Sequence, residues 1–236
     1  MQPPMSRNSC KRILRIYATF APPAGGKLLN AMLITQGGSA TLLQNPNARL
    51  KATNAIADAT AVNFRADGAP MLLNVPFAAT SSYVTLTQGS HLLTLELSNI
   101  PGVAAASLTR TLDPARDYSL VAAGTSAAPA VIAFTDDNSL PTAGFAKVRF
   151  VNAAAGSSPV DVQVNFAGVA GGLAFGTASS YYSVAPGTTY TLTFASNGGL
   201  TVLASLSNAE LDAGGVYTVY LLGTSGAAQA RLVRDR

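Results

Sequence analysis

The chain has 236 residues, of which 48% are hydrophobic and only 11% are charged. Disordered chains combine low hydrophobicity with high net charge, so this composition excludes a largely disordered protein. Six basic residues and no acidic residue lie within positions 1–49, and from residue 50 onward acidic residues slightly outnumber basic ones. A nucleic-acid-binding domain concentrates Lys and Arg on its folded part, so the charge map predicts no nucleic-acid partner.

The N-terminal segment, residues 1–47, is predicted to lie outside the folded domains. Its basic residues extend to Lys27, an apolar run occupies residues 28–34, and small residues follow at 37–40, which is the order of an export signal. A pair of prolines and a pair of glycines interrupt that order. A cleaved leader, a disordered leader and a strand-donating segment therefore remain alternatives.

The first predicted domain spans residues 48–138 and consists of short strands separated by turns. Apolar residues recur with the period of two that half-buried strands show. They stand at Val62 and Phe64, then at Leu93, Leu95 and Leu97, then at Tyr118, Leu120 and Ala122. Turn dipeptides separate these runs at Asp67-Gly68, Gln88-Gly89 and Pro101-Gly102.

A polar stretch at residues 135–144 contains Pro and Gly and marks the boundary between two domains, with residues 139–145 as the linker. Asp136-Asp137-Asn138 offers oxygen ligands of the kind that calcium binds, but three adjacent ligands fall short of the six to eight oxygens that Ca²⁺ takes. We therefore favour a solvated linker, with calcium as the alternative that the sequence leaves open.

The second predicted domain spans residues 146–236. Its alternating apolar positions are Val160, Val162 and Val164, followed by Tyr190, Leu192 and Phe194. Residues 216–222 are apolar on both faces, which predicts a central strand that is covered on each side.

The two domains match each other along their lengths. Residues 50–55 match residues 148–153, and residues 77–83 match residues 175–181, both at an offset of 98. After a one-residue shift, Tyr118 matches Tyr217. One register held through so many turns indicates a repeat. Short strands at intervals of about 8 to 12 residues, without sustained helical periodicity, then predict an all-β protein of two tandem immunoglobulin-like antiparallel β-sandwich domains.

A family resemblance rests on residues 148–153, on Pro159-Val160-Asp161-Val162, on the Pro186-Gly187 turn and on the closing Tyr217-Thr218-Val219-Tyr220. By these motifs the second repeat resembles domain-of-unknown-function family 4397, exported bacterial β-sandwich modules that often occur in tandem. The resemblance covers the first repeat less well, because Asn63 stands where the second repeat has Asp161. It implies a secreted, periplasmic or cell-surface setting and supplies no activity.

No catalytic, cofactor-binding or metal-binding residue is predicted, and we expect a protein that is not an enzyme and uses no cofactor. His91 is the only histidine, and no nucleophile elbow lies near it, so we interpret it as a solvent-facing strand residue. One histidine and one cysteine, Cys10, cannot build a zinc site or a disulfide within the chain. No apolar run reaches the ~20 residues that span a bilayer, so no transmembrane span is predicted.

Three polar residues have structural explanations. Asp161 alternates with core valines and is expected to face outward, with Arg149 on a neighbouring strand as its partner. Asn54 and Asn152 end strands ahead of a loop, where asparagine accepts left-handed backbone angles and bonds to the next amides.

The tyrosines Tyr83 and Tyr181-Tyr182 form either a sugar-stacking platform or part of the core, and we favour packing. The predicted function is a non-enzymatic binding or structural module of the cell envelope or the extracellular space, adhesion-like, with a protein or glycan partner. The alternative is a subunit of a surface filament or assembly, in which residues 28–44 pair as an extra strand with the sheet edge of a neighbouring chain. Self-assembly therefore stays open.

Overall fold

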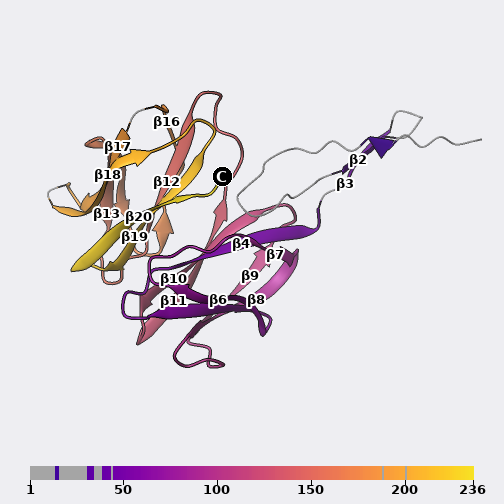
Figure 1. Ribbon diagram of the computed structural model, residues 1–236, viewed down its shortest axis with the longest axis horizontal. Helices are drawn as coiled ribbons and strands as arrows, with labels where there is room; N and C mark the ends of the chain where they lie inside the picture. The colour runs from indigo at the N-terminus through magenta and orange to yellow at the C-terminus, as the bar shows by residue number, and fades with distance from the viewer. Residues whose placement is uncertain (1–13, 16–30, 35–38, 44, 188, 200) are drawn as a thin grey trace, which may run out of the picture.

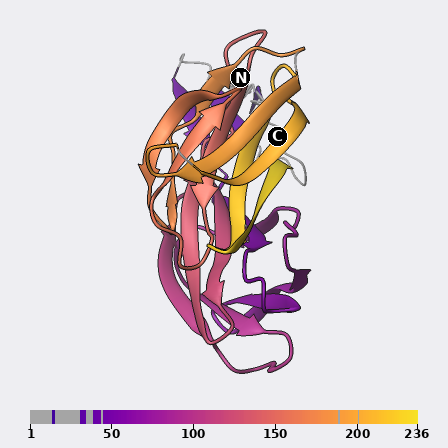
Figure 2. The ribbon, with the colours of Figure 1, turned by 90° about the vertical axis from the view of Figure 1, so that its left-hand side faces the viewer.

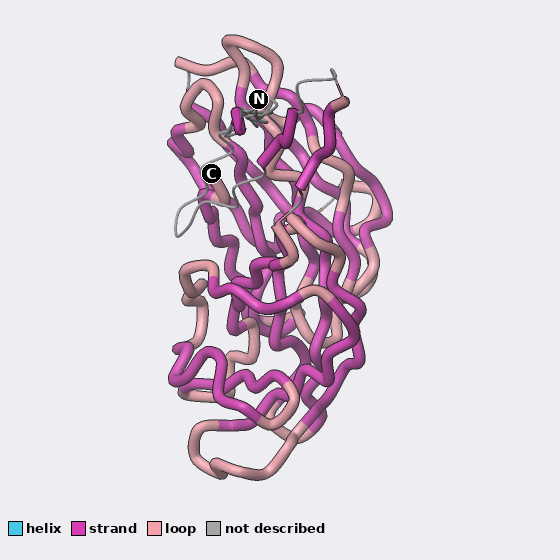
Figure 3. Tube along the Cα trace, turned by 90° about the vertical axis from the view of Figure 1, so that its right-hand side faces the viewer, coloured by secondary structure: helices cyan, strands magenta, loops and turns pink. Residues whose placement is uncertain are grey.

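The computed structural model describes residues 14–15, 31–34, 39–43, 45–187, 189–199 and 201–236. All regular structure in these residues is β-strand, as predicted, and Figure 3 shows no helical segment. Within the same residues there is accordingly no helix with the length and apolar character needed to cross a membrane.

The N-terminal strands form a small sheet of their own. β1 (Leu14–Arg15), β2 (Ala31–Ile34) and β3 (Ala40–Leu43) pair in the order β1-β2-β3, so β3 is an edge strand. Figure 1 shows β2 and β3 beyond the edge of the rest of the protein. Much of the predicted export signal lies outside the described residues.

The first sandwich consists of two four-stranded sheets, ordered β11-β10-β4-β7 and β6-β5-β8-β9. Its strands are β4 (Asn47–Asn54), β5 (Ala61–Ala66), β6 (Ala69–Pro76), β7 (Val84–Thr87), β8 (Gly89–Leu97), β9 (Ala106–Leu112), β10 (Asp117–Thr125) and β11 (Ala128–Asp136). The alternating apolar positions point between the sheets, where Phe64, Leu93 and Leu120 are fully buried.

The second sandwich repeats this plan, with sheets ordered β14-β13-β17-β18 and β12-β19-β20; β15 and β16 both pair with the free side of β12. Its strands are β12 (Ala146–Asn152), β13 (Val160–Val164), β14 (Ala167–Leu173), β15 (Thr177–Ala178), β16 (Tyr182–Val184), β17 (Thr189–Ser196), β18 (Val202–Glu210), β19 (Val216–Thr224) and β20 (Ala227–Arg234). Phe150 and Phe194 meet edge to face in its core, with ring centroids 5.8 Å apart.

Both sandwiches contain one parallel strand pair among antiparallel neighbours. β4 pairs in parallel with β10, and β12 pairs in parallel with β19. A tyrosine closes the same corner in each repeat, because the Tyr118 hydroxyl accepts the Asp113 amide and the Tyr217 hydroxyl accepts the Asp212 amide, both at 2.9 Å. The predicted repeat of two β-sandwiches is therefore present in the fold.

The two sandwiches lie one beyond the other along the length of the molecule (Figure 2). They meet through the outer faces of the sheets that contain β10 and β19. A third apolar cluster fills this contact, built from Ala55, Val121, Ala123, Val151, Ala153, Tyr220 and Leu222. The prediction that residues 216–222 form a strand covered on each side is confirmed, and the second cover is the other sandwich.

Candidate functional site

Four charged side chains lie buried between the sandwiches, and we call them the ion cluster: Lys51, Asp136, Arg149 and Asp235. Lys51 pairs with Asp235, and Arg149 pairs with Asp136. Lys51 Nζ also lies 3.9 Å from Asp136 Oδ2. Each basic residue therefore binds an acidic residue of the opposite sandwich.

Hydroxyl groups complete the ion cluster. Ser119 and Tyr83 donate hydrogen bonds to Asp136 at 2.8 and 2.7 Å, and Thr218 donates one to Asp235 at 2.5 Å. Burial raises the pKa of Asp235 despite the nearby Lys51 ammonium. Burial acts on Asp136 in the same way, but the charges of Arg149 and Lys51 outweigh it and hold its pKa below the usual range.

The interpretation of Asp136-Asp137-Asn138 as a solvated linker is wrong for two of its three residues. Asp136 ends β11 with 4% of its surface exposed, and the buried Asn138 side chain donates to Asp117 Oδ2 at 2.7 Å. Only Asp137 faces outward, where it pairs with Lys147 at 2.7 Å. The described residues contain no group of three His, Cys, Asp or Glu side chains that could hold a metal ion.

His91 is buried rather than solvent-facing. Its Nδ1 lies 2.7 Å from Asp67 Oδ2 and its Nε2 lies 2.9 Å from the Thr87 carbonyl oxygen. The Leu92 amide and His91 both hydrogen-bond to Asp67 and lower the pKa of its carboxyl. With both ring nitrogens occupied, His91 ties the β5–β6 turn to β8.

Asp161 faces outward as predicted, but its expected partner is wrong, because Arg149 points into the interface. The two carboxylate oxygens of Asp161 accept hydrogen bonds from the Gly172 amide at 2.9 Å and the Gly198 amide at 2.8 Å. Asp161 thereby joins β14 to the turn between β17 and β18.

Asn54 and Asn152 are buried at matching positions. Asn54 Oδ1 accepts the Ile56 amide and Asn152 Oδ1 accepts the Ala154 amide, which confirms the predicted bonds to following amides. Neither residue has a positive φ, so the predicted left-handed angles are wrong. Their Nδ2 groups instead donate to the carbonyl oxygens of Val75 and Leu173.

Tyr83 and Tyr181 face the interface, and none of the three tyrosines forms part of a sugar-stacking platform. The Tyr83 ring lies 5.1 Å from Lys51 Nζ, and the Tyr181 ring lies 5.2 Å from the Arg149 guanidinium carbon. Tyr182 packs half-buried against the core of the second sandwich. Cation–π contacts and burial explain all three side chains, as the favoured packing interpretation requires.

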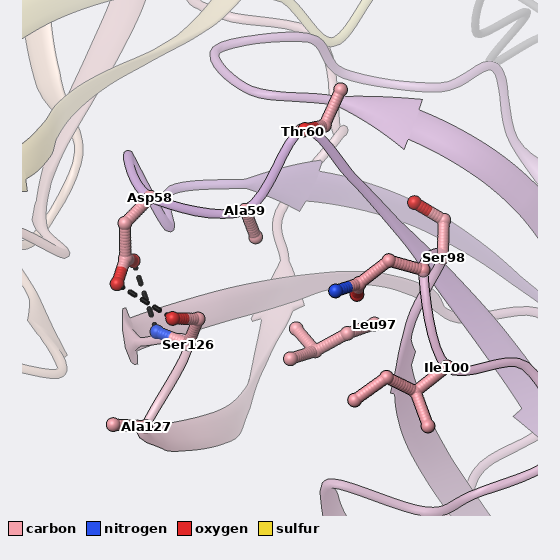
Figure 4. A pocket seen from close by; sticks show the side chains of 9 residues that line it. Asp58, Ala59, Thr60, Leu97, Ser98, Ile100, Ser126 and Ala127 are labelled. Atoms are coloured by element: carbon pink, nitrogen blue, oxygen red, sulfur yellow. Dashed lines mark hydrogen bonds between the residues drawn. The ribbon is translucent and has the colours of Figure 1, made fainter.

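A pocket of about 300 Å³ opens at one end of the first sandwich. Figure 4 shows Asp58 and Ser126 on one side of it and Leu97 and Ile100 on the other. Asp58 accepts the Ser126 amide at 2.9 Å and the Ser126 hydroxyl at 2.7 Å, and these bonds lower the pKa of its carboxyl. The carboxylate thus fastens the loop before β5 to the β10–β11 hairpin.

A shallow groove of about 520 Å³ lies on the outer face of the second sandwich, and we call it the β13–β14 groove. Its lining residues are Asp161, Gln163, Gly168, Val169, Ala170, Gly171, Gly198 and Gly199. Gly168 pairs with Gln163 across the hairpin, and a Cβ added at Gly168 would meet nothing within 4 Å. At the positions of Gly168 and Gly171 the first repeat has Pro70 and Leu73, so the equivalent hairpin carries larger side chains there.

Phe166 stands at the tip of the hairpin that builds the groove. The residue is 79% exposed, and its φ of 67° lies in the left-handed region. Asn165 before it also has a positive φ, so the two residues form the two-residue hairpin turn that favours glycine at its second position. The first repeat follows that preference with Asp67-Gly68. The aligned repeats could have revealed this departure from the sequence alone, but the sequence prediction missed it.

The fold and the open groove define a tandem β-sandwich module with a polar, solvent-exposed surface hollow. The family of the domain of unknown function DUF4397 matches residues 48–163 and again residues 146–236. The chain belongs to this family, and the predicted resemblance is confirmed for both repeats.

Among solved structures, the chain is similar to the crystal structure of CBMbc (family CBM26) from Eubacterium rectale Amy13K in complex with maltoheptaose. The sequence identity is 9% and the TM-score is 0.26, over 80% of this chain and 97% of that chain. A likeness with this TM-score carries no argument about the ligand of the present protein. No curated protein matches the chain.

Proposed function

We propose that the protein is a non-enzymatic binding module of the bacterial cell envelope or the extracellular space, and that it takes a glycan at the β13–β14 groove. The observation that carries the proposal is the exposed Phe166 in a left-handed conformation at the tip of the hairpin whose strands line this groove. An L-residue pays about 1–2 kcal/mol for that conformation. Strain of this kind is concentrated at functional sites, because selection for function can maintain what stability disfavours.

The chemistry of the groove favours a neutral glycan. Gln163 offers an amide that both donates and accepts, and Asp161 is the single charged group of the lining. Gly168 leaves open space beside Gln163, and Phe166 exposes an aromatic ring at the tip of the same hairpin. An aromatic face beside a few polar groups is the usual composition of a site for a partly apolar, partly polar ligand. A protein loop with exposed hydroxyl and amide groups is the other partner that this lining would suit.

The lining does not suit acid–base catalysis. Among the described residues of the lining Asp161 is the one titratable side chain, and each of its carboxylate oxygens already accepts a backbone amide. General acid–base catalysis needs a positioned group that is free to exchange a proton with the substrate. A binding role uses the groove as it stands.

Export is supported by the sequence: basic residues, an apolar run and small residues follow one another near the N-terminus, and the folded part carries few charges. Fractionation of cells that express the full chain tests this setting. Recovery of the protein only from the cytosol would contradict it.

The binding proposal is tested by screening the full chain on an array of bacterial and host polysaccharides, followed by calorimetry with the best binder. Phe166→Gly adopts the residue of the first repeat and should weaken binding at least tenfold while leaving the fold intact. Gly168→Leu fills the groove and should have a similar effect. Ile100→Ser, in the pocket of Figure 4, is the matched control and should bind normally.

Two outcomes would contradict the proposal. If Phe166→Gly and Gly168→Leu bind as tightly as the wild type while Ile100→Ser does not, the site is the pocket of the first sandwich. If no polysaccharide binds the wild type, the glycan is excluded and a protein partner remains for the same groove.

A second candidate function is a subunit of a surface assembly. The observation that favours it is the separate β1-β2-β3 sheet. Among the described residues β3 has a paired strand on one side only, so its other edge can pair with a neighbouring chain. Light scattering of the full chain and of residues 48–236 tests it. A monomer at every concentration in both proteins would remove strand donation.

A further inference from the structure

The interface between the sandwiches is built twice from equivalent positions. At the repeat offsets of 98 and 99, Lys51 corresponds to Arg149, Asp136 to Asp235 and Ser119 to Thr218. Lys51 reaches across to Asp235, and Arg149 reaches back to Asp136. This reciprocity, in which residue i contacts residue j and j contacts i, defines an isologous, two-fold interface.

The apolar part of the contact obeys the same relation. Ala55 corresponds to Ala153, Val121 to Tyr220 and Ala123 to Leu222, and all six are fully buried in the interface cluster. Both sandwiches therefore present the same face, with one cation, one anion, a hydroxyl and a small apolar patch. The apolar patches differ in size, because the larger Tyr220 and Leu222 stand where the first repeat has Val121 and Ala123.

We propose that this face is a docking surface for a second copy of the chain, in which the first sandwich of one molecule pairs with the second sandwich of another. The size difference selects this combination, because two second sandwiches would bring two Tyr220 rings to equivalent crowded positions. Every buried charge keeps a partner in the exchanged pair, which satisfies the main requirement for burying ions. The inference does not depend on the glycan proposal.

The linker decides between the closed monomer and the exchanged dimer. Residues 137–145 join the two sandwiches, and a short linker gives its ends an effective concentration in the mM range. The monomer is therefore preferred at low concentration. Exchange becomes competitive when the chain concentration approaches that value, because the two forms share the same interface contacts.

The test uses the intact chain, unfolded in urea and refolded at about 1 µM and at about 500 µM, near the effective concentration. Light scattering should report monomer after dilute refolding and a dimer fraction of tens of per cent after concentrated refolding. A mixture of ¹⁵N-labelled and unlabelled chains should give dimers of intermediate mass in native mass spectrometry. A chain that stays monomeric at both concentrations would overturn the proposal.

Charge variants identify the surface. Asp235→Lys places a third cation beside Lys51 and Arg149 and should abolish the dimer, whereas the double variant Lys51→Asp with Asp235→Lys should restore it. Asp212→Lys changes an exposed pair with Arg234 and serves as the control. A dimer that is equally abundant in Asp235→Lys must arise from another surface, such as the β1-β2-β3 sheet, and would refute the docking face.

Discussion

Removing one member of the ion cluster should destabilise the protein far more than removing a complete pair. Lys51→Met leaves Asp235 and Asp136 buried with Arg149 as the one remaining cation of the ion cluster. Breaking a buried ion pair in this way costs about 3–5 kcal/mol, because an uncompensated charge stays out of water. The double variant Lys51→Met with Asp235→Leu removes both charges and leaves the Arg149–Asp136 pair in place. Its cost should be about 1 kcal/mol, the penalty for the Thr218 hydroxyl that loses its acceptor.

Urea unfolding of the wild type, both single variants and the double variant measures the coupling between Lys51 and Asp235. We expect a coupling of at least about 2 kcal/mol, because contacting groups in one network are not additive. The matched control is the exposed pair of Arg234 and Asp212, with side chains 53% and 63% exposed, where the same cycle should give less than about 1 kcal/mol. The reasoning fails if Lys51→Met unfolds within about 1 kcal/mol of the wild type or if the two single costs simply add.

The remaining predictions concern pH, a buried amide and a glycine. Burial lowers the pKa of Lys51, but Asp235 and other neighbours outweigh it and raise the pKa above 10.5. The contribution of Lys51 to stability is therefore complete below pH 10.5 and is lost as the pH rises through the raised pKa, so above pH 10.5 the melting temperature should fall more steeply for the wild type than for Lys51→Met. Asn152→Ala removes the partner of the Ala154 amide and of the Leu173 carbonyl oxygen and should cost about 2–3 kcal/mol in urea unfolding, with Asn54→Ala close to it; a cost near zero would contradict the role of these bonds. Gly124→Ala, at a φ of +90° where a Cβ would overlap the Ala128 carbonyl oxygen, should cost about 2–4 kcal/mol by the same measurement, whereas Gly168→Ala, with open space, should cost under about 1 kcal/mol.

The strands were predictable because the core of each sandwich depends on local alternation. Val160 and Val162 point inward and Asp161 points outward, as a period of two requires. The parallel pairing of β4 with β10 was not predictable in this way, because alternation specifies faces and not neighbours. Residues distant in sequence decide that pairing.

The interface was not predictable from the same pattern. Lys51 alternates with the core residues Leu50 and Ala52, so its position reads as a solvent-facing one. The sheet of the second sandwich that buries Lys51 lies about a hundred residues further along the chain, and no residue pattern around Lys51 indicates that this sheet covers it. The doubly apolar run at 216–222 did indicate a second cover, and only its identity was missing.

The ion cluster fixes the relative orientation of the two sandwiches, which the apolar contact alone would not fix. A patch of Ala, Val and Leu side chains tolerates a small rotation or shift between two sheets, because dispersion contacts are not directional. Four buried charges do not tolerate it, since a shift that separates Lys51 from Asp235 also separates Arg149 from Asp136 through the two-fold relation. The relative position of the sandwiches is therefore fixed by electrostatics while apolar burial supplies much of the stability. The β13–β14 groove of the second sandwich is consequently held in one orientation relative to the first sandwich.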